Sequence, residues 1–310
     1  MNKERLNRLK PLIGLLIFSV IISIINPRFL SIFNILNVLR QTSINAIIAA
    51  GMTFVILTGG IDLSVGSVLA FSGAVAAAMV AAGQPLILVL IVTLITGTAM
   101  GLVTGTIISR GKVQAFIATL VTMTIVRGAT LVFTEGKPIN AGIGRASDSF
   151  AWLGGGYILG IPVPVYIMAV VYAIVWYTLH QTRFGRYTYA LGGNEEAARL
   201  SGLSTKKLKT IVYGISGFLA SLSGIIMTSR LSSAQPTAGT GYELDAIAAV
   251  VLGGTSLAGG SGRILGTVVG ALIIGVLNNS LNLMNVSSYY QMIAKGAVIL
   301  LAVLIDRKNK

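Results

Sequence analysis

The chain alternates between long apolar runs and short segments that hold charge, Pro or paired Gly. A helix needs about 20 consecutive apolar residues to cross a bilayer. Ten runs approach that length, near residues 11–26, 35–57, 63–82, 86–108, 113–134, 162–180, 209–229, 243–258, 264–282 and 286–305. The pattern therefore predicts an all-α integral membrane protein with about ten transmembrane helices, forming a single transmembrane domain over residues 1–310.

Glycine modifies this pattern in two ways. Paired glycines at 59–60 and 253–254 interrupt apolar sequence, so some spans are expected to be discontinuous or re-entrant. Gly97, Gly101 and Gly105 instead recur every fourth residue within one run. Such a stripe lets helix backbones approach closely in lipid, and we assign it to helix packing rather than to a ligand.

Composition and charge agree with a membrane location. Only 10% of the 310 residues are charged, whereas soluble domains are typically about 25% charged. The net charge of +14 comes from basic residues in short stretches between apolar runs, without the interleaved aromatics of a nucleic-acid site. With the N-terminus inside, segments 3–10, 110–112, 183–209 and 307–310 together with residue 263 hold 16 of the 23 Lys and Arg residues. This asymmetry predicts that both termini are cytoplasmic.

Motifs for chemistry are missing from the sequence. There is no Cys and only one His, which excludes disulfides, thiolate metal sites and a site with two His ligands. A G-x-x-x-x-G-K-S/T phosphate loop is also absent, because Gly111-Lys112 is followed by Val113. We therefore expect no catalytic residue, no metal and no bound cofactor on this chain. If ATP powers the protein, another chain must hydrolyse it.

Polar side chains recur on one face of two of the predicted spans. Two explanations remain open: these residues line a wet path for a polyhydroxylated solute, or they form hydrogen bonds between helices, worth about 1 kcal/mol or less each. The first face holds Ser31, Asn34, Gln41 and Asn45, and the second holds Asn278, Asn282 and Asn285. Of these, the candidate pathway or gate residues are Asn45, Asn278, Asn282 and Asn285.

Three charged residues, Asp62, Arg127 and Lys295, fall within or beside apolar runs. A charge at the centre of a span costs about 2.5–3.5 kcal/mol, so each is expected to face protein or water. An ion pair, a contact with backbone carbonyls and a gating role are all open, and Asp62 joins the pathway candidates. Glu243 and Asp245 are expected at the outer end of a span, where they need no partner.

The predicted cytoplasmic loop 181–209 specifies a short helix. Asn194 is a favourable N-cap, and Glu195 and Glu196 place negative charge in the first turn, where the helix dipole favours it. Gly202 suits the left-handed conformation that ends a helix. The loop therefore predicts a self-capped helix at the cytoplasmic face.

Ala197 and Ala198 lie between charged neighbours in this helix. Two adjacent small residues suit a helix that docks in a groove of another protein. A solvated connector is the alternative, and the degree of local specification favours docking.

Five stretches of the chain resemble the branched monosaccharide-permease family of ATP-binding-cassette importers, and the likeness covers essentially the whole sequence. They are INAIIAAGMTFVILTGGIDLSVGS (44–67), QAFIATL (114–120), GRYTYALGGNEEAARLSG (185–202), SSAQPTAGTGYELDAIAAVVLGGTSLAGG (232–260) and SSYYQMI (287–293).

The resemblance implies a multi-pass permease subunit of the bacterial inner membrane that carries a monosaccharide by alternating access. The sugar that it implies is D-ribose. It also implies three protein partners: a second permease copy, a cytoplasmic ATPase with two cassettes that binds ATP and Mg, and a periplasmic sugar-binding protein. The ATPase would dock on Gly192, Gly193, Asn194, Glu195, Ala197, Ala198 and Gly202. The rival is a secondary transporter driven by an ion gradient, for which Asp62 is the candidate carboxylate.

Overall fold

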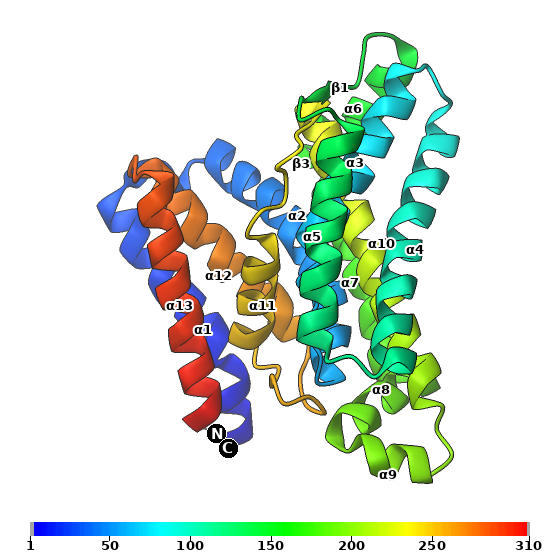
Figure 1. Cartoon of the computed structure of the whole chain (residues 1–310). Helices are drawn as coiled ribbons and strands as arrows, with labels where there is room; N and C mark the ends of the chain where they lie inside the picture. The colour runs from blue at the N-terminus through cyan, green and yellow to red at the C-terminus, as the bar shows by residue number, and fades with distance from the viewer. Residues whose placement is uncertain (1–2, 309–310) are drawn as a thin grey trace.

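The computed structural model describes the backbone of residues 3–308 and the side chains of 12–298, 300 and 304. Helices make up nearly all of this part of the chain (Figure 1). They are α1 (Lys3–Ile25), the short 3-10 helix η1 (Pro27–Leu30), α2 (Ile32–Leu57), α3 (Val65–Ala81), α4 (Leu86–Gly111), α5 (Ala115–Phe133), α6 (Arg145–Gly155), α7 (Val163–Gln181), α8 (Arg183–Gly193), α9 (Glu195–Leu200), α10 (Thr205–Leu231), α11 (Tyr242–Leu252), α12 (Ile264–Leu283) and α13 (Ser288–Lys308).

Six of these helices are long and apolar enough to cross a membrane: α2, α4, α5, α7, α10 and α12. Residues 12–25 of α1, and α3, are apolar but shorter. The all-α membrane class predicted from the sequence is confirmed. Helix α4 shows why these helices suit lipid, because Ile87, Ile91 and Ile95 recur at one-turn spacing and are each at least half exposed.

Helix α10 lies at the centre of the bundle, packed against α2, α3, α4 and α6. Its most extensive contact is with α4, where the predicted glycine stripe lies directly against the α10 backbone. A Cβ at Gly101 would collide with the Tyr213 carbonyl, and one at Gly97 would meet Gly217 and Ser221. The assignment of the stripe to helix packing is confirmed.

The eighth predicted span, 243–258, is wrong as a complete membrane crossing. Helix α11 has only 11 residues, which gives a length of about 16 Å, roughly half of a hydrocarbon core of about 30 Å. It is preceded by the α10–α11 segment (232–241), seen in yellow in Figure 1 as irregular chain running alongside the helices. The glycine pair predicted to break this run does end the helix, with Gly254 at φ +87°.

The first glycine pair also acts as predicted. Helix α2 ends at Leu57, Gly59 adopts φ +76°, and the chain stays non-helical until α3 begins at Val65. The two helices are therefore separated by a loop whose second half, residues 62–64, is buried.

The two ends of the bundle differ in structure. Helices α8 and α9 lie at the same end as the start of α1 and the end of α13 (Figure 1). The opposite end carries α6 and a two-residue strand pair, β1 (Ile139–Asn140) with β4 (Ser233–Ala234). A second pair joins β2 (Tyr157–Ile158) to β3 (Ile161–Pro162). The search for apolar runs did not predict α6 or the strands, because the strands have two residues each and the α6 sequence is too polar to form a membrane-spanning run. The basic residues of segments 3–10 and 307–310, which support the predicted orientation, lie outside the residues whose side chains the structure describes.

Candidate functional site

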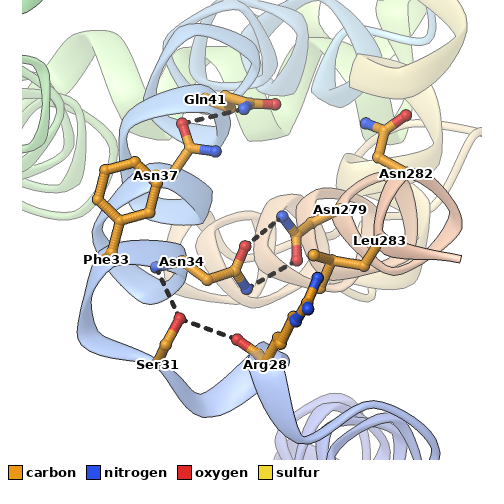
Figure 2. Close-up of a pocket in the computed structure, with 9 residues that line it drawn as sticks. All are labelled: Arg28, Ser31, Phe33, Asn34, Asn37, Gln41, Asn279, Asn282 and Leu283. Carbon is orange, nitrogen blue, oxygen red and sulfur yellow. Dashed lines mark hydrogen bonds between the residues drawn. The ribbon is translucent and has the colours of Figure 1, made fainter. Parts of the chain in front are cut away.

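A polar pocket of about 370 Å³ lies between η1, the start of α2 and the end of α12 (Figure 2). In Figure 1 the elements that line it meet at the end of the bundle opposite α8 and α9. Amide side chains dominate its lining. The polar residues that line it are Arg28, Ser31, Asn34, Asn37, Gln41, Asn279 and Asn282.

One amide pair in the pocket fastens α2 to α12. The Asn34 Nδ2 donates to Asn279 Oδ1 at 3.0 Å, and Asn279 Nδ2 donates to Asn34 Oδ1 at 2.8 Å (Figure 2). Both side chains are buried. For Asn34, the explanation as a hydrogen bond between helices is therefore correct. Asn279 was missed from the sequence, where Asn278 was chosen instead.

The other amides are partly open to the pocket. Gln41 Nε2 donates to Asn37 Oδ1 at 3.1 Å, one turn along α2. Asn282 is exposed and accepts a hydrogen bond of 2.9 Å from Gln291 of α13. These side chains keep further donors and acceptors available to a polar solute.

A second polar cluster surrounds Asp245 of α11, whose side chain is 2% exposed. Its Oδ2 accepts hydrogen bonds from Lys295 Nζ of α13 at 3.0 Å, Asn45 Nδ2 of α2 at 3.1 Å and Asn278 Nδ2 of α12 at 3.4 Å. The expectation that Asp245 needs no partner at the outer end of a span is wrong. Because α11 is a half-length helix, its first turn lies inside the bundle, where a charge requires a counter-ion.

The Asp245 cluster has unused hydrogen-bonding capacity. Asn45 Oδ1 and Asn278 Oδ1 are both buried without a partner among the described residues. Buried polar atoms are nearly always paired, so such acceptors mark a place where a water or a hydroxyl donor can bind. Asn45 follows Asn34 by eleven residues along α2, or about 16 Å, so amides connect the outer pocket to this deeper cluster.

Arg127 of α5 stabilises the α10–α11 segment. Its Nη1 donates to the carbonyl oxygens of Pro236 at 3.0 Å and Ala238 at 2.8 Å. Non-helical backbone is tolerated inside a membrane protein only when its polar groups are satisfied by other parts of the protein or by water. Of the roles left open from the sequence, Arg127 has the contact with backbone carbonyls and Lys295 has the ion pair.

Asp62 is separate from both polar clusters. Its Oδ1 accepts from the Ser64 amide at 3.0 Å and the Ser64 hydroxyl at 2.6 Å, and its Oδ2 accepts from the Ser216 hydroxyl at 2.7 Å. These neutral donors hold the buried carboxylate in the loop between α2 and α3. Asn285 is also outside the pocket lining, in the α12–α13 turn with a left-handed φ of 55°.

The loop at the opposite end folds into two helices, α8 and α9. The predicted cap is present, since Asn194 Oδ1 accepts from the Ala197 amide at 2.9 Å, and Gly202 has φ +85°. Glu196 pairs with Arg199, and this hydrogen bond lowers the pKa of the Glu196 carboxyl. Glu195 instead pairs with Lys209 at the start of α10, at 2.6 Å.

The two alanines of α9 differ in burial. Ala197 is exposed, whereas Ala198 is only 5% exposed and packs inside this chain. Leu200, at 72% exposure, lies on the outer surface of the same helix. The outward face that a partner could contact therefore contains Ala197 and Leu200 rather than both alanines.

Glycine backbones join this region to the membrane helices. A Cβ at Gly192 would collide with the Leu57 carbonyl at the end of α2, and Gly260 donates its amide to the same carbonyl at 2.9 Å. A Cβ at Gly259 would press on Gly59 and Gly192. We call this contact the glycine junction: Gly59, Gly192, Gly193, Gly259 and Gly260. It connects α8 with the end of α2 and with the loop between α11 and α12.

Among the described residues, no group of three or more His, Cys, Asp or Glu side chains is arranged to hold a metal ion. The acidic residues in the bundle are instead paired with Lys295, with amides or with hydroxyls. The arrangement provides hydrogen bonds for a polar solute.

Comparison with known proteins agrees with this picture. Residues 34–303 match the profile of the family described as branched-chain amino acid transport system / permease component. The ribose import permease protein of Haemophilus influenzae is 63% identical over 294 residues, covering 95% of this chain and 91% of the relative. The protein of that name from Escherichia coli K12 is 60% identical over 309 residues, covering 100% and 96%. The one from Bacillus subtilis is 57% identical over 304 residues, covering 98% and 94%.

No solved structure matches the chain. The relatives are named as permeases of import systems, which are transport components rather than enzymes. With at least six helices suited to span a bilayer, the protein is a multi-pass protein of the bacterial inner membrane. The chain belongs to the branched-chain amino acid transport system / permease component family.

Proposed function

We propose that the chain is the membrane subunit of an ATP-binding-cassette importer that moves D-ribose into the cell by alternating access. The names of relatives at 57–63% identity support ribose as the cargo. In this proposal both termini are cytoplasmic and about ten segments lie in the membrane, with α11 as a half-length segment. The outer pocket then opens toward the periplasm, and α8 and α9 lie in the cytoplasm.

The observation that carries the proposal is the series of amides on α2 and α12. Asn37, Gln41 and Asn282 line the outer pocket, and Asn45 and Asn278 lie at the deeper Asp245 cluster. A sugar loses the hydrogen bonds of its hydroxyl groups when it leaves water, and each loss costs roughly 1–3 kcal/mol unless the bond is replaced. Amide side chains replace both donors and acceptors, and they carry no charge that would bind the sugar too tightly.

The unpaired oxygens of Asn45 and Asn278 fit the inner end of this path. Each can accept a hydrogen bond from a sugar hydroxyl while its Nδ2 continues to donate to Asp245. The half-length helix supports the same location, because discontinuous helices place substrate sites near the middle of the membrane in many transporters.

Three partners complete the proposed importer. A periplasmic sugar-binding protein delivers ribose, a second copy of the permease completes the pathway, and lipid covers the apolar surface. A cytoplasmic ATPase with two cassettes binds ATP and Mg, so this chain needs no cofactor of its own. The ATPase docks on α9, whose outward side holds Ala197 and Leu200. The glycine junction connects that helix to the pathway helix α2.

Reconstitution tests the transport path. The chain is placed in liposomes with its presumed ATPase and binding protein, and ribose uptake and ATP hydrolysis are measured together. N37A and N282A are expected to lower ribose uptake at least fivefold with the complex still assembled, whereas N285G should transport normally. Glycine suits the left-handed backbone of residue 285, which makes it a matched control. Equal uptake by all variants would remove the amides from the path.

A second comparison tests the docking face. A197R should fold normally and lose ribose-dependent ATP hydrolysis, because it adds bulk and charge to the exposed side of α9. A198R should instead lower the yield of folded protein, since that side chain is buried within the chain. If A197R forms an active complex, the ATPase docks elsewhere. If no complex forms with the wild-type chain, the secondary transporter becomes the better proposal and Asp62 the residue to test.

A further inference from the structure

A second cavity, of about 430 Å³, lies at the α8–α9 end of the bundle, far from the polar pocket of Figure 2. The loop after α2, the end of α4, the start of α5, α9 and the first turns of α10 surround it. Its lining includes three basic side chains, Lys112, Lys206 and Lys209, and one acidic side chain, Glu195. The proposed sugar path does not use this cavity.

The positive charge in the cavity is not neutralised. Glu195 pairs with Lys209 at 2.6 Å, while no described carboxylate lies within 4.0 Å of Lys112 or Lys206. The lining therefore keeps a net charge of about +2, which attracts anions.

Helix α5 adds backbone donors to the same place. It begins at Ala115, and the preceding Gln114 gives no side-chain cap. The first backbone hydrogen bond of this helix is donated by the Ala118 amide to the Gln114 carbonyl oxygen. The amides of the three residues before Ala118 are therefore free to bind a ligand. Val113, Gln114 and Ala115 all line the cavity. Free amides and the positive end of the dipole in a 19-residue helix favour an anion.

Tyr213 provides an independent indication of a ligand. Its side chain is 1% exposed, and its hydroxyl has no hydrogen-bond partner among the described residues. The hydroxyl lies against Gly60, where a Cβ would collide with it, and both residues line the cavity. A buried hydroxyl without a partner is rare, so a polar group that reaches the inner end of the cavity would satisfy it.

The backbone of Lys112 adds to this argument. It ends α4 in the left-handed region, with φ 55°, where glycine is the favoured residue. A lysine that lines a cavity from a backbone conformation that favours glycine is consistent with a use for its charge there.

We infer that this cavity binds a small anion carrying a phosphate group, with the phosphate held by Lys112, Lys206 and the first amides of α5. A hydroxylated remainder, as in a sugar phosphate, reaches Tyr213. The anion competes with Glu195 for Lys209, which links its binding to α9. The inference concerns binding to the chain alone and does not depend on which sugar is transported.

Binding to the purified full-length chain in dodecylmaltoside, measured by titration calorimetry, tests the site. Inorganic phosphate and ribose 5-phosphate are the soluble probes. We expect saturable binding. K112G and K206Q should each raise Kd about fivefold, which corresponds to the upper range of the free energy of one exposed ion pair. E195Q should lower Kd, because it removes the competing carboxylate. Y213F should weaken ribose 5-phosphate binding more than phosphate binding.

Lys207 provides the matched control. It is the next residue on α10, exposed, and absent from the lining, so K207Q removes the same charge and should leave Kd unchanged. K112G keeps the left-handed backbone of residue 112 favourable, so this variant should fold and a change in its Kd reports the loss of the charge. No saturable binding, or equal effects of K206Q and K207Q, would overturn the site.

Nanodiscs distinguish a lipid head group from a soluble compound as the source of the bound phosphate group. If a lipid head group fills the cavity, phosphate should bind in phosphatidylcholine nanodiscs and be displaced in phosphatidylglycerol nanodiscs, and K206Q should weaken that displacement. If the ligand is soluble, the two nanodiscs should give the same Kd. Either outcome supports a phosphate site and identifies its source.

Discussion

The ion pair between Asp245 and Lys295 gives the sharpest prediction about stability. D245N keeps the shape of the side chain but removes the charge that faces Lys295 Nζ at 3.0 Å. It also places an amide donor among groups that are already donors, Asn45 and Asn278. The lysine is left without its counter-ion in the interior of the bundle.

The expected cost follows from burial. Removing one member of a buried ion pair typically costs about 3–5 kcal/mol. The Asp245 side chain is 2% exposed but that of Lys295 is 28% exposed, so water partly stabilises the lysine that remains. We therefore expect D245N to lower the free energy of unfolding by about 3 kcal/mol, at the low end of that range. K295M should cost more, because it leaves the fully buried carboxylate with amide donors only.

The assay is equilibrium unfolding in mixed micelles of dodecylmaltoside and SDS, followed by tryptophan fluorescence. The double variant D245N/K295M should be at least about 2 kcal/mol less destabilised than the sum of the single variants, since neither charge remains unpaired. D148N, an exposed acid on α6, is the control for loss of one negative charge. Additive costs, or a cost for D245N equal to that of D148N, would refute the structural role of the pair.

Three further predictions concern other parts of the chain. R127M should cost about 3 kcal/mol, from two charge-assisted hydrogen bonds, and should speed hydrogen exchange in the α10–α11 segment, whereas variants of exposed arginines should not. G192A should disrupt the contact with the Leu57 carbonyl and reduce ribose-dependent ATP hydrolysis with little change in ATPase binding. The lowered pKa of Glu196 means that its pairing with Arg199 adds stability above the ordinary pKa of 4.5 and loses it as pH falls through the lower folded value. Carboxylate infrared bands of the wild type, compared with those of E196Q, should therefore show Glu196 more than half ionised at pH 4.5.

Features determined by neighbouring residues could be predicted from the sequence. The cap of α9 needs only Asn194 and the amide three residues later, so residue type and spacing were sufficient. The glycine pairs after α2 and α11 were predicted as breaks because they interrupt apolar sequence, and one glycine of each pair, Gly59 and Gly254, has the left-handed backbone that favours glycine. The glycine stripe of α4 was assigned to packing by its spacing alone.

Features that depend on contacts between distant helices could not be predicted. Asp245 and Lys295 are 50 residues apart, and nothing local shows that α11 begins inside the bundle rather than at its surface. The apolar residues around Asp245 resemble a complete span, which concealed the half-length helix. Helix periodicity grouped Asn278 with Asn282, but in the structure Asn278 turns to α11 while its neighbour Asn279 turns to α2.

The glycine junction has a mechanical consequence. Side chains at most interfaces can change rotamer, and in doing so they absorb small displacements. Between Gly192, the Leu57 carbonyl and Gly260 the contacts are made by backbone atoms, which have no rotamers to change. This interface is therefore as stiff as the main chain itself. We therefore expect a displacement of α8 to move the end of α2 and the loop after α11 by nearly the same amount.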